Sequence, residues 1–143
     1  MRLSITTPRG AIVEADIEEI TAPGLVGEFG VLPGHVPLMA ALKPGVLTYR
    51  TAEHTRTLAV SQGFLQVAAT TVDERPTDRI LVLVSDALTA GSIDAAAVKK
   101  DLAEAEAEIA AWKREPDGTY HALVARRDWA LAQIGAAARA TPS

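Results

Sequence analysis

Cysteine is absent from the 143 residues, and histidine occurs three times. The lack of cysteine excludes disulfides, zinc sites with cysteine ligands and thiol catalysis. His35, His54 and His121 lie far apart in the sequence and form no HxxxH or HExxH pair. Because a histidine metal site would then depend on distant carboxylates, we expect no metal. We also expect no cofactor.

Long apolar runs and catalytic signatures are missing as well. The sequence contains no run of about 18 apolar residues, the length that could span a membrane. Its start, MRLSITTPRG, has neither a secretory nor a transit-peptide pattern. The net charge of −4 and the pI of about 5.3 argue against nucleic acid as a partner. Without GxxxxGK[ST], GxGxxG or GxSxG, the sequence predicts no catalytic residues and no self-contained enzyme.

The composition changes near residue 88. Residues 1–87 are rich in valine, isoleucine, threonine, glycine and proline, whereas 16 of the 27 alanines lie between positions 95 and 140. Proline and glycine mark the turns between strands, and alanine is the best helix former. We therefore predict two domains, a β domain over 1–87 and a helical domain over 88–143.

Short apolar or alternating segments recur through the first part. They cover residues 3–6, 11–15, 17–22, 36–42, 46–50, 55–60, 64–67 and 80–84. Many short strands separated by regular turns are typical of a β-sandwich or a flattened barrel.

The second part predicts two helices. The first can be capped by Ser92 or Asp94, and it ends at a turn over residues 116–118. Apolar residues follow helical spacing, with Val98, Leu102, Ala105, Ile109 and Trp112 in the first helix and Tyr120, Val124, Leu131, Ile134 and Ala138 in the second. The short turn makes them an antiparallel hairpin. Because alanine buries little area, this hairpin must dock on the β domain or on a partner.

A long motif then identifies a family. Residues 27–38 read GEFGVLPGHVPL, and LKPG follows at 42–45. This closely resembles the ε subunits of bacterial F-type ATP synthases, whose pattern is roughly GE-[FL]-G-x-[LY]-P-G-H-x-P, a short apolar strand and K-P-G. The segments 61–67 and 82–87, and the helical hairpin, are similar to the same family, so the resemblance covers nearly the whole chain.

The resemblance implies a mechanical function. In the family the sandwich packs against the γ subunit of the central stalk and rests on the ring of c subunits, which couples ion-driven rotation to ATP synthesis. Carried over to this sequence, the contact loop comprises Glu28, Phe29, Gly30, Pro33, Gly34 and His35. The implied location is the cytoplasmic face of the bacterial inner membrane, reached only through the complex.

The resemblance also implies a regulatory arm. In the family the hairpin can extend towards the α and β subunits of the catalytic head and block ATP hydrolysis. The cations that could meet acidic surfaces there are Lys99, Lys100, Lys113, Arg114, Arg126 and Arg127.

Two departures from the family pattern stand out. Residues 68–79 are an apparent insertion of polar residues, with 69–79 expected to form a protruding loop. The family's nucleotide motif I-D-x-x-R-A retains Ile93 and Asp94 here, but Ala97 replaces the arginine. Because alanine cannot hold a phosphate or a ribose, the sequence argues against nucleotide binding.

Two other readings stay open at this point. One is a stand-alone β-sandwich that binds a carbohydrate or peptide, which would need an exposed aromatic groove, although aromatics make up only 4% of the chain. The other is a hydrolase with a carboxylate pair. Glu18 and Glu19 are expected to point to opposite faces of a strand, and Asp73 and Asp78 lie in the expected loop, a poor place for preorganised chemistry.

Overall fold

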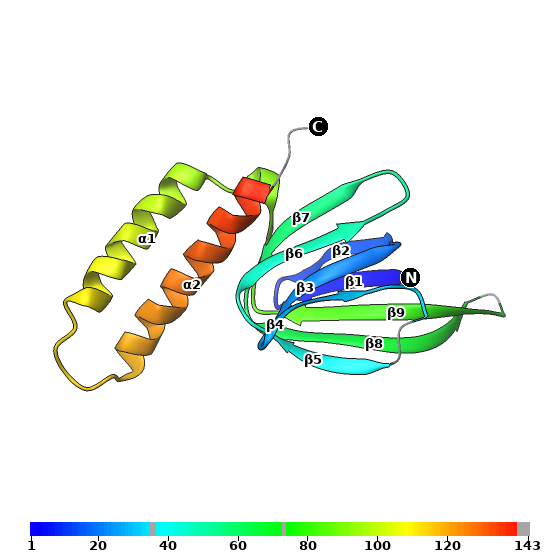
Figure 1. Ribbon diagram of the computed structural model, residues 1–143, viewed down its shortest axis with the longest axis horizontal. Coiled ribbons are helices and arrows are strands. Elements are labelled where there is room, and N and C mark those ends of the chain that lie inside the picture. Colours follow the sequence, from blue (N-terminus) through cyan, green and yellow to red (C-terminus); the bar gives the residue numbers. More distant parts are fainter. Residues whose placement is uncertain (35–36, 73, 140–143) are drawn as a thin grey trace.

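The computed structural model describes residues 1–34, 37–72 and 74–139. Figure 1 shows a β-sandwich, on the right, joined to a pair of helices on the left. This architecture confirms the predicted sandwich followed by a helical hairpin. Within these residues the sheet has ten strands, and the main order is β10-β7-β6-β3-β5-β8-β9-β1-β2, with β4 paired to β3.

The strands follow the short apolar segments of the sequence. Their bounds are β1 Arg2–Thr7, β2 Gly10–Asp16, β3 Glu19–Gly24, β4 Gly27–Val31, β5 Leu38–Leu42, β6 Gly45–Arg50, β7 Thr55–Val60, β8 Gly63–Val72, β9 Arg75–Val84 and β10 Ala87–Thr89. All neighbours pair antiparallel except β1 and β9, which run parallel. Inward-facing leucine, isoleucine and valine form one core, in which Leu3, Ile5 and Leu47 are fully buried. The predicted boundary at 87/88 falls inside β10, and this strand still pairs with β7 of the sandwich.

The strand β4 was not predicted, since residues 27–31 were interpreted as part of a loop. In the structure β3 and β4 form a hairpin whose two-residue turn is Leu25-Val26. Gly27 has φ of +137°, a conformation that glycine adopts without strain. A Cβ on Gly24 would lie 2.9 Å from the Phe29 ring, so this glycine makes room for the phenylalanine. The glycines that suggested a loop therefore shape a tight hairpin.

The apparent insertion also differs from the expected loop. Residues 68–72 and 75–79 continue the antiparallel ladder of β8 and β9, from Ala68 opposite Arg79 to Val72 opposite Arg75. Figure 1 shows this ribbon reaching beyond the rest of the sandwich. The protrusion was correctly predicted, but it is a strand pair, in which Thr70, Thr71 and Thr77 are residues that favour a pleated ladder.

Two helices follow the short 3-10 helix η1 (Ala90–Ser92). Helix α1 spans Ala95–Ala110 and α2 spans Gly118–Arg139. Asp94, one of the two predicted caps, accepts a hydrogen bond from the Ala97 amide at 3.2 Å. Asp117, which was not predicted as a cap, accepts hydrogen bonds from the first amides of α2. The predicted turn therefore also starts the second helix.

Helix α2 lies between α1 and the sandwich (Figure 1). The predicted seam of α1 is confirmed, because its five residues are buried or half-buried. In α2 the prediction fails for Leu131, which is 48% exposed, and for Ala138, also exposed. A helix packed on two sides buries two stripes, and the buried residues of α2 are Ala130, Ala132 and Ala136. Single-stripe periodicity could not separate these faces.

Candidate functional site

The β3–β4 hairpin presents an apolar tip. Leu25 is 64% exposed and Val26 is fully exposed. Beside the tip lies a groove of about 460 Å³, lined by residues 24–30 and by Leu38, Ala40 and Ala41 of β5. Glu28 is exposed at this groove, whereas Phe29 is half-buried against the core. Leu25 and Val26 were missed in the sequence analysis, because an isolated apolar pair in a turn has no periodic signal.

The predicted contact residues divide between the two ends of β4. Glu28, Phe29 and Gly30 belong to the strand, close to the tip, whereas Pro33 and Gly34 follow its other end. The Gly34 amide donates a 2.7 Å hydrogen bond to the Asp78 carboxylate on β9. His35 lies outside the described residues. The structure thus separates the predicted loop into a tip region and a turn held by β9.

A second apolar surface crosses β5, β8 and β9. Phe64 is directly opposite Ala41 on one side and Leu83 on the other. Phe64 is 54% exposed and Leu83 is 47% exposed. Met39, two residues from Ala41 and therefore on the same face, is 66% exposed. Clustered exposed side chains of this size mark a candidate protein-binding face.

The predicted cations of the hairpin have different surroundings. Lys99, Lys100 and Lys113 are exposed, and the Arg114 guanidinium stacks 4.4 Å from the Trp112 ring. At the same end of the hairpin, the Trp112 and Tyr120 rings are 5.5 Å apart. Arg127 pairs with its neighbour Asp128.

Arg126 is held inside the hairpin by three carboxylates of α1. Its Nε donates to Asp101 at 2.8 Å, and its guanidinium contacts Glu104 at 3.2 Å and Glu108 at 3.6 Å. The hydrogen bond from Arg126 lowers the pKa of Asp101 below its ordinary value, and the same bond raises the pKa of Arg126. In this arrangement Arg126 joins the two helices.

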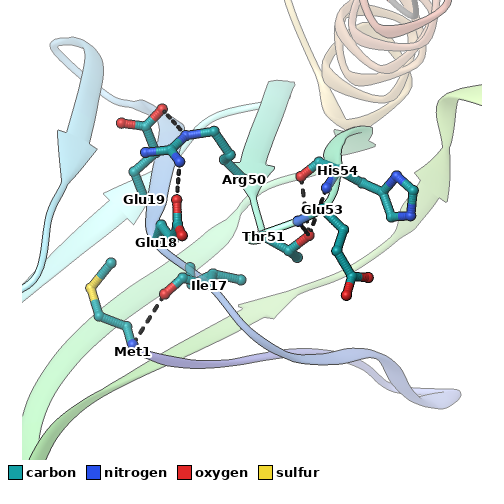
Figure 2. A network of polar contacts seen from close by, with 8 residues as sticks. All are labelled: Met1, Ile17, Glu18, Glu19, Arg50, Thr51, Glu53 and His54. Atoms are coloured by element: carbon teal, nitrogen blue, oxygen red, sulfur yellow. Dashed lines mark hydrogen bonds and ion pairs between the residues drawn. The ribbon is translucent and has the colours of Figure 1, made fainter. Parts of the chain in front are cut away.

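The carboxylate pair considered for a hydrolase has a structural contact instead. Figure 2 shows Glu18 and Glu19 both directed at Arg50 on β6, with Glu19 Oε1 at 3.2 Å from Arg50 Nε. The expectation that these two side chains point apart is wrong, because Glu18 precedes β3 and is outside the strand alternation. A guanidinium between them neutralises the carboxylates that a hydrolase would need as acid and base. Of the other pair, Asp73 lies outside the described residues.

The remaining candidate residues also serve the fold. Ile93 packs beside Ala90 and Ala132, and Asp94 caps α1. Among residues 1–34, 37–72 and 74–139, no group of three or more histidine, aspartate or glutamate side chains is arranged to hold a metal ion. Neither helix, as far as the structure describes it, is long and apolar enough to cross a membrane.

Comparison with known proteins decides the family. The family model described as "ATP synthase, Delta/Epsilon chain, beta-sandwich domain" matches residues 1–73. The ATP synthase epsilon chain 2 of Syntrophotalea carbinolica is 38% identical, over 97% of this chain and 94% of its own length. The epsilon chain of Anoxybacillus flavithermus is 39% identical, over 78% of this chain and 77% of its own.

The chain belongs to the epsilon-chain family of ATP synthases. Two solved structures agree with it in fold. One is from the Euglena gracilis mitochondrial ATP synthase, with a TM-score of 0.72, 23% identity and coverage of 91% of this chain and 76% of the other. The second is from the central stalk and c-ring of the Tetrahymena thermophila mitochondrial ATP synthase, with a TM-score of 0.65, 16% identity and coverage of 96% of both chains. Membership in this family replaces the readings as a stand-alone binding module or a hydrolase.

Proposed function

We propose that the chain works in the central stalk of an ATP synthase, where it joins γ and the c-ring and couples ion-driven rotation to ATP synthesis. As an epsilon chain it is a non-catalytic subunit, and its partners are other subunits of the complex. In this proposal residues 1–87 bind the stalk and residues 88–143 form a regulatory arm. The chain is then a peripheral protein on the cytoplasmic face of a bacterial inner membrane.

The observation that supports the stalk contacts most directly is the presence of two exposed apolar surfaces on the sandwich, which adjoin at β5. The face formed by Met39, Phe64 and Leu83 suits a long, flat contact such as that with γ. The tip of the β3–β4 hairpin suits a narrower contact with the ring. There Leu25 and Val26 supply apolar area, and Glu28 offers a carboxylate to basic residues of the ring loops.

Co-purification from solubilised membranes tests both contacts, with the full chain as bait. Phe64→Asp should abolish recovery of γ, because it places a charge in the centre of the apolar face. Leu25→Asp should leave γ bound and reduce recovery of the ring. Ile12→Asp is the matched control, since Ile12 is also an exposed apolar side chain, 39% exposed on strand β2. Wild-type recovery of γ by the Phe64→Asp chain would refute the assignment of this face.

The second part of the proposal is that the hairpin inhibits ATP hydrolysis when it extends into the head. Its support is the placement of Lys99, Lys100 and Lys113, which are exposed while the hairpin is docked and are available to acidic surfaces of α and β. Arg126 contributes by joining the helices.

The test of inhibition uses assembled complexes that contain a chain ending at Ser92, the last residue of η1. Loss of the hairpin should raise the rate of ATP hydrolysis and leave coupling intact. Unchanged hydrolysis under all conditions would remove the inhibitory function.

A further inference from the structure

The contact between the hairpin and the sandwich is apolar, and its fully buried residues are small. Ala132 and Ala136 of α2 pack on Ala59 of β7 and Ala90 of η1. Gly135 comes so close to β6 that an added Cβ would be 3.1 Å from Val46 Cγ2. Small side chains in close approach give a specific fit but bury little area.

One ion pair reinforces this contact. Arg139 Nη1, at the end of α2, lies 3.6 Å from Glu28 Oε2 on β4. Across the described parts of the chain, every other ion pair of the helices joins two residues of the hairpin itself. The Arg139–Glu28 pair is therefore the one charged link between arm and sandwich in those parts.

Glu28 is also the carboxylate at the apolar tip. Leu25 and Val26 precede it in the same hairpin, and all three line one groove. A partner that covers this groove with a cation would place that cation next to Arg139. Two like charges at one carboxylate repel each other, so each weakens the binding of the other.

We propose that Glu28 is shared between two competing contacts, one with Arg139 of the docked hairpin and one with a cationic partner at the β3–β4 tip. A partner that engages Glu28 then favours release of the hairpin, and a docked hairpin weakens the partner's contact by the same factor. This inference rests on the proposed contact with the ring. It adds that occupancy of that contact biases the state of the regulatory arm.

The expected coupling is modest. Arg139 and Glu28 are both about half exposed, with side-chain exposures of 54% and 53%. Exposed ion pairs of this kind change an equilibrium by about 1.5- to 5-fold. Such a factor changes the docking constant, which a urea titration of the docked state resolves even where the docked form predominates.

The first experiment measures docking in the isolated full-length chain. Trp129 packs beside the docking contact, so its fluorescence reports docking once Trp112 has been replaced by phenylalanine. In that background Glu28→Gln and Arg139→Gln should each lower the docking constant by about 1.5- to 5-fold. The double variant should fall no further than either single one. Lys100→Gln removes a positive charge from an exposed position of α1, which packs on the other side of α2, and should leave docking unchanged.

Independent effects that multiply in the double variant, or no effect of either single substitution, would overturn the proposal. The second experiment measures binding of the same chains to purified c-ring in detergent. Arg139→Gln should bind about 1.5- to 5-fold more tightly than the wild type, and this gain should disappear when Glu28 is also replaced by glutamine. Equal binding with and without Arg139 would overturn the competition. Failure of every variant to bind the ring would refute the proposed ring contact and the competition together, whereas the result in the isolated chain would still decide whether the ion pair stabilises docking.

Discussion

The close approach of Gly135 to Val46 predicts that Gly135→Leu releases the hairpin. The added Cβ would already be 3.1 Å from Val46 Cγ2, and leucine adds three more carbon atoms beyond that Cβ. Val46 or helix α2 must therefore shift. Overpacking of this kind costs about 1–3 kcal/mol.

The docking contact provides a free energy of similar size. Its buried residues are Ala59, Ala90, Ala132 and Ala136. At about 0.8 kcal/mol per buried methyl-sized group, these four side chains contribute about 3 kcal/mol together, and the half-buried Val46, Ile93 and Trp129 add to it. The overpacking cost offsets part of the docking free energy, and the docking constant should fall by about 5- to 150-fold.

Release is distinguishable from unfolding of the helix. Leucine has a higher helix propensity than glycine, by about 0.8 kcal/mol, so α2 itself should be more stable after the substitution. The expected result is a change in Trp129 fluorescence, measured in a Trp112→Phe background, while the far-UV circular dichroism keeps its helical signal. In assembled complexes the released hairpin should then inhibit ATP hydrolysis more strongly.

Gly118→Leu is the matched control. Gly118 is in the same helix, and an added Cβ there would meet no atom within 4 Å. The control should keep the wild-type Trp129 signal. If Gly135→Leu and Gly118→Leu gave the same fluorescence and the same hydrolysis rate, the close contact with Val46 would not determine docking.

Two further predictions concern stability. Gly63→Ala should destabilise the sandwich by about 3 kcal/mol or more, because the new Cβ would lie 1.9 Å from the Leu83 carbonyl oxygen, a backbone atom that cannot rotate away. Urea unfolding measures this loss, and Gly30→Ala, whose Cβ would lie 3.7 Å from its nearest neighbour, should have little effect. The second prediction follows from the lowered pKa of Asp101, which stabilises the hairpin above the ordinary aspartate pKa of about 3.9 and ceases to do so as the pH falls through the lower folded value. Helicity followed by circular dichroism should therefore decrease at acid pH, and Arg126→Ala should remove that part of the decrease; an unchanged acid titration in this variant would contradict the assigned cause.

Much of the fold was predictable because its signals are local. Alternation located most strands of the sandwich, and the spacing from Val98 to Trp112 gave the buried face of α1. The cap at Asp94 needs only one side chain and the amide three residues later. In each case the residues that determine the structure are neighbours in the sequence.

The features that were missed depend on distant residues. Strand β4 pairs only with β3 among the described strands, and its glycines resemble those of a loop until Phe29 is seen to pack over Gly24. The exposure of Leu131 follows from the position of α2 between α1 and the sandwich. Glu18 and Glu19 converge because Arg50 comes from another strand. Sequence periodicity contains no information on such partners.

The two faces of α2 are stabilised by different forces, so they should respond to different variables. Towards α1, Arg126 and its three carboxylates form an exposed ionic cluster that salt screens and acid weakens. Towards the sandwich, the contact is apolar, with buried alanines and with Gly135 against Val46, so side-chain size governs it. Since Gly135 lies against β6 and Arg126 against α1, the effect of Gly135→Leu on docking and the effect of Arg126→Ala on acid stability should add in a double variant. A strong departure from additivity would mean that docking and the internal packing of the hairpin form one cooperative unit.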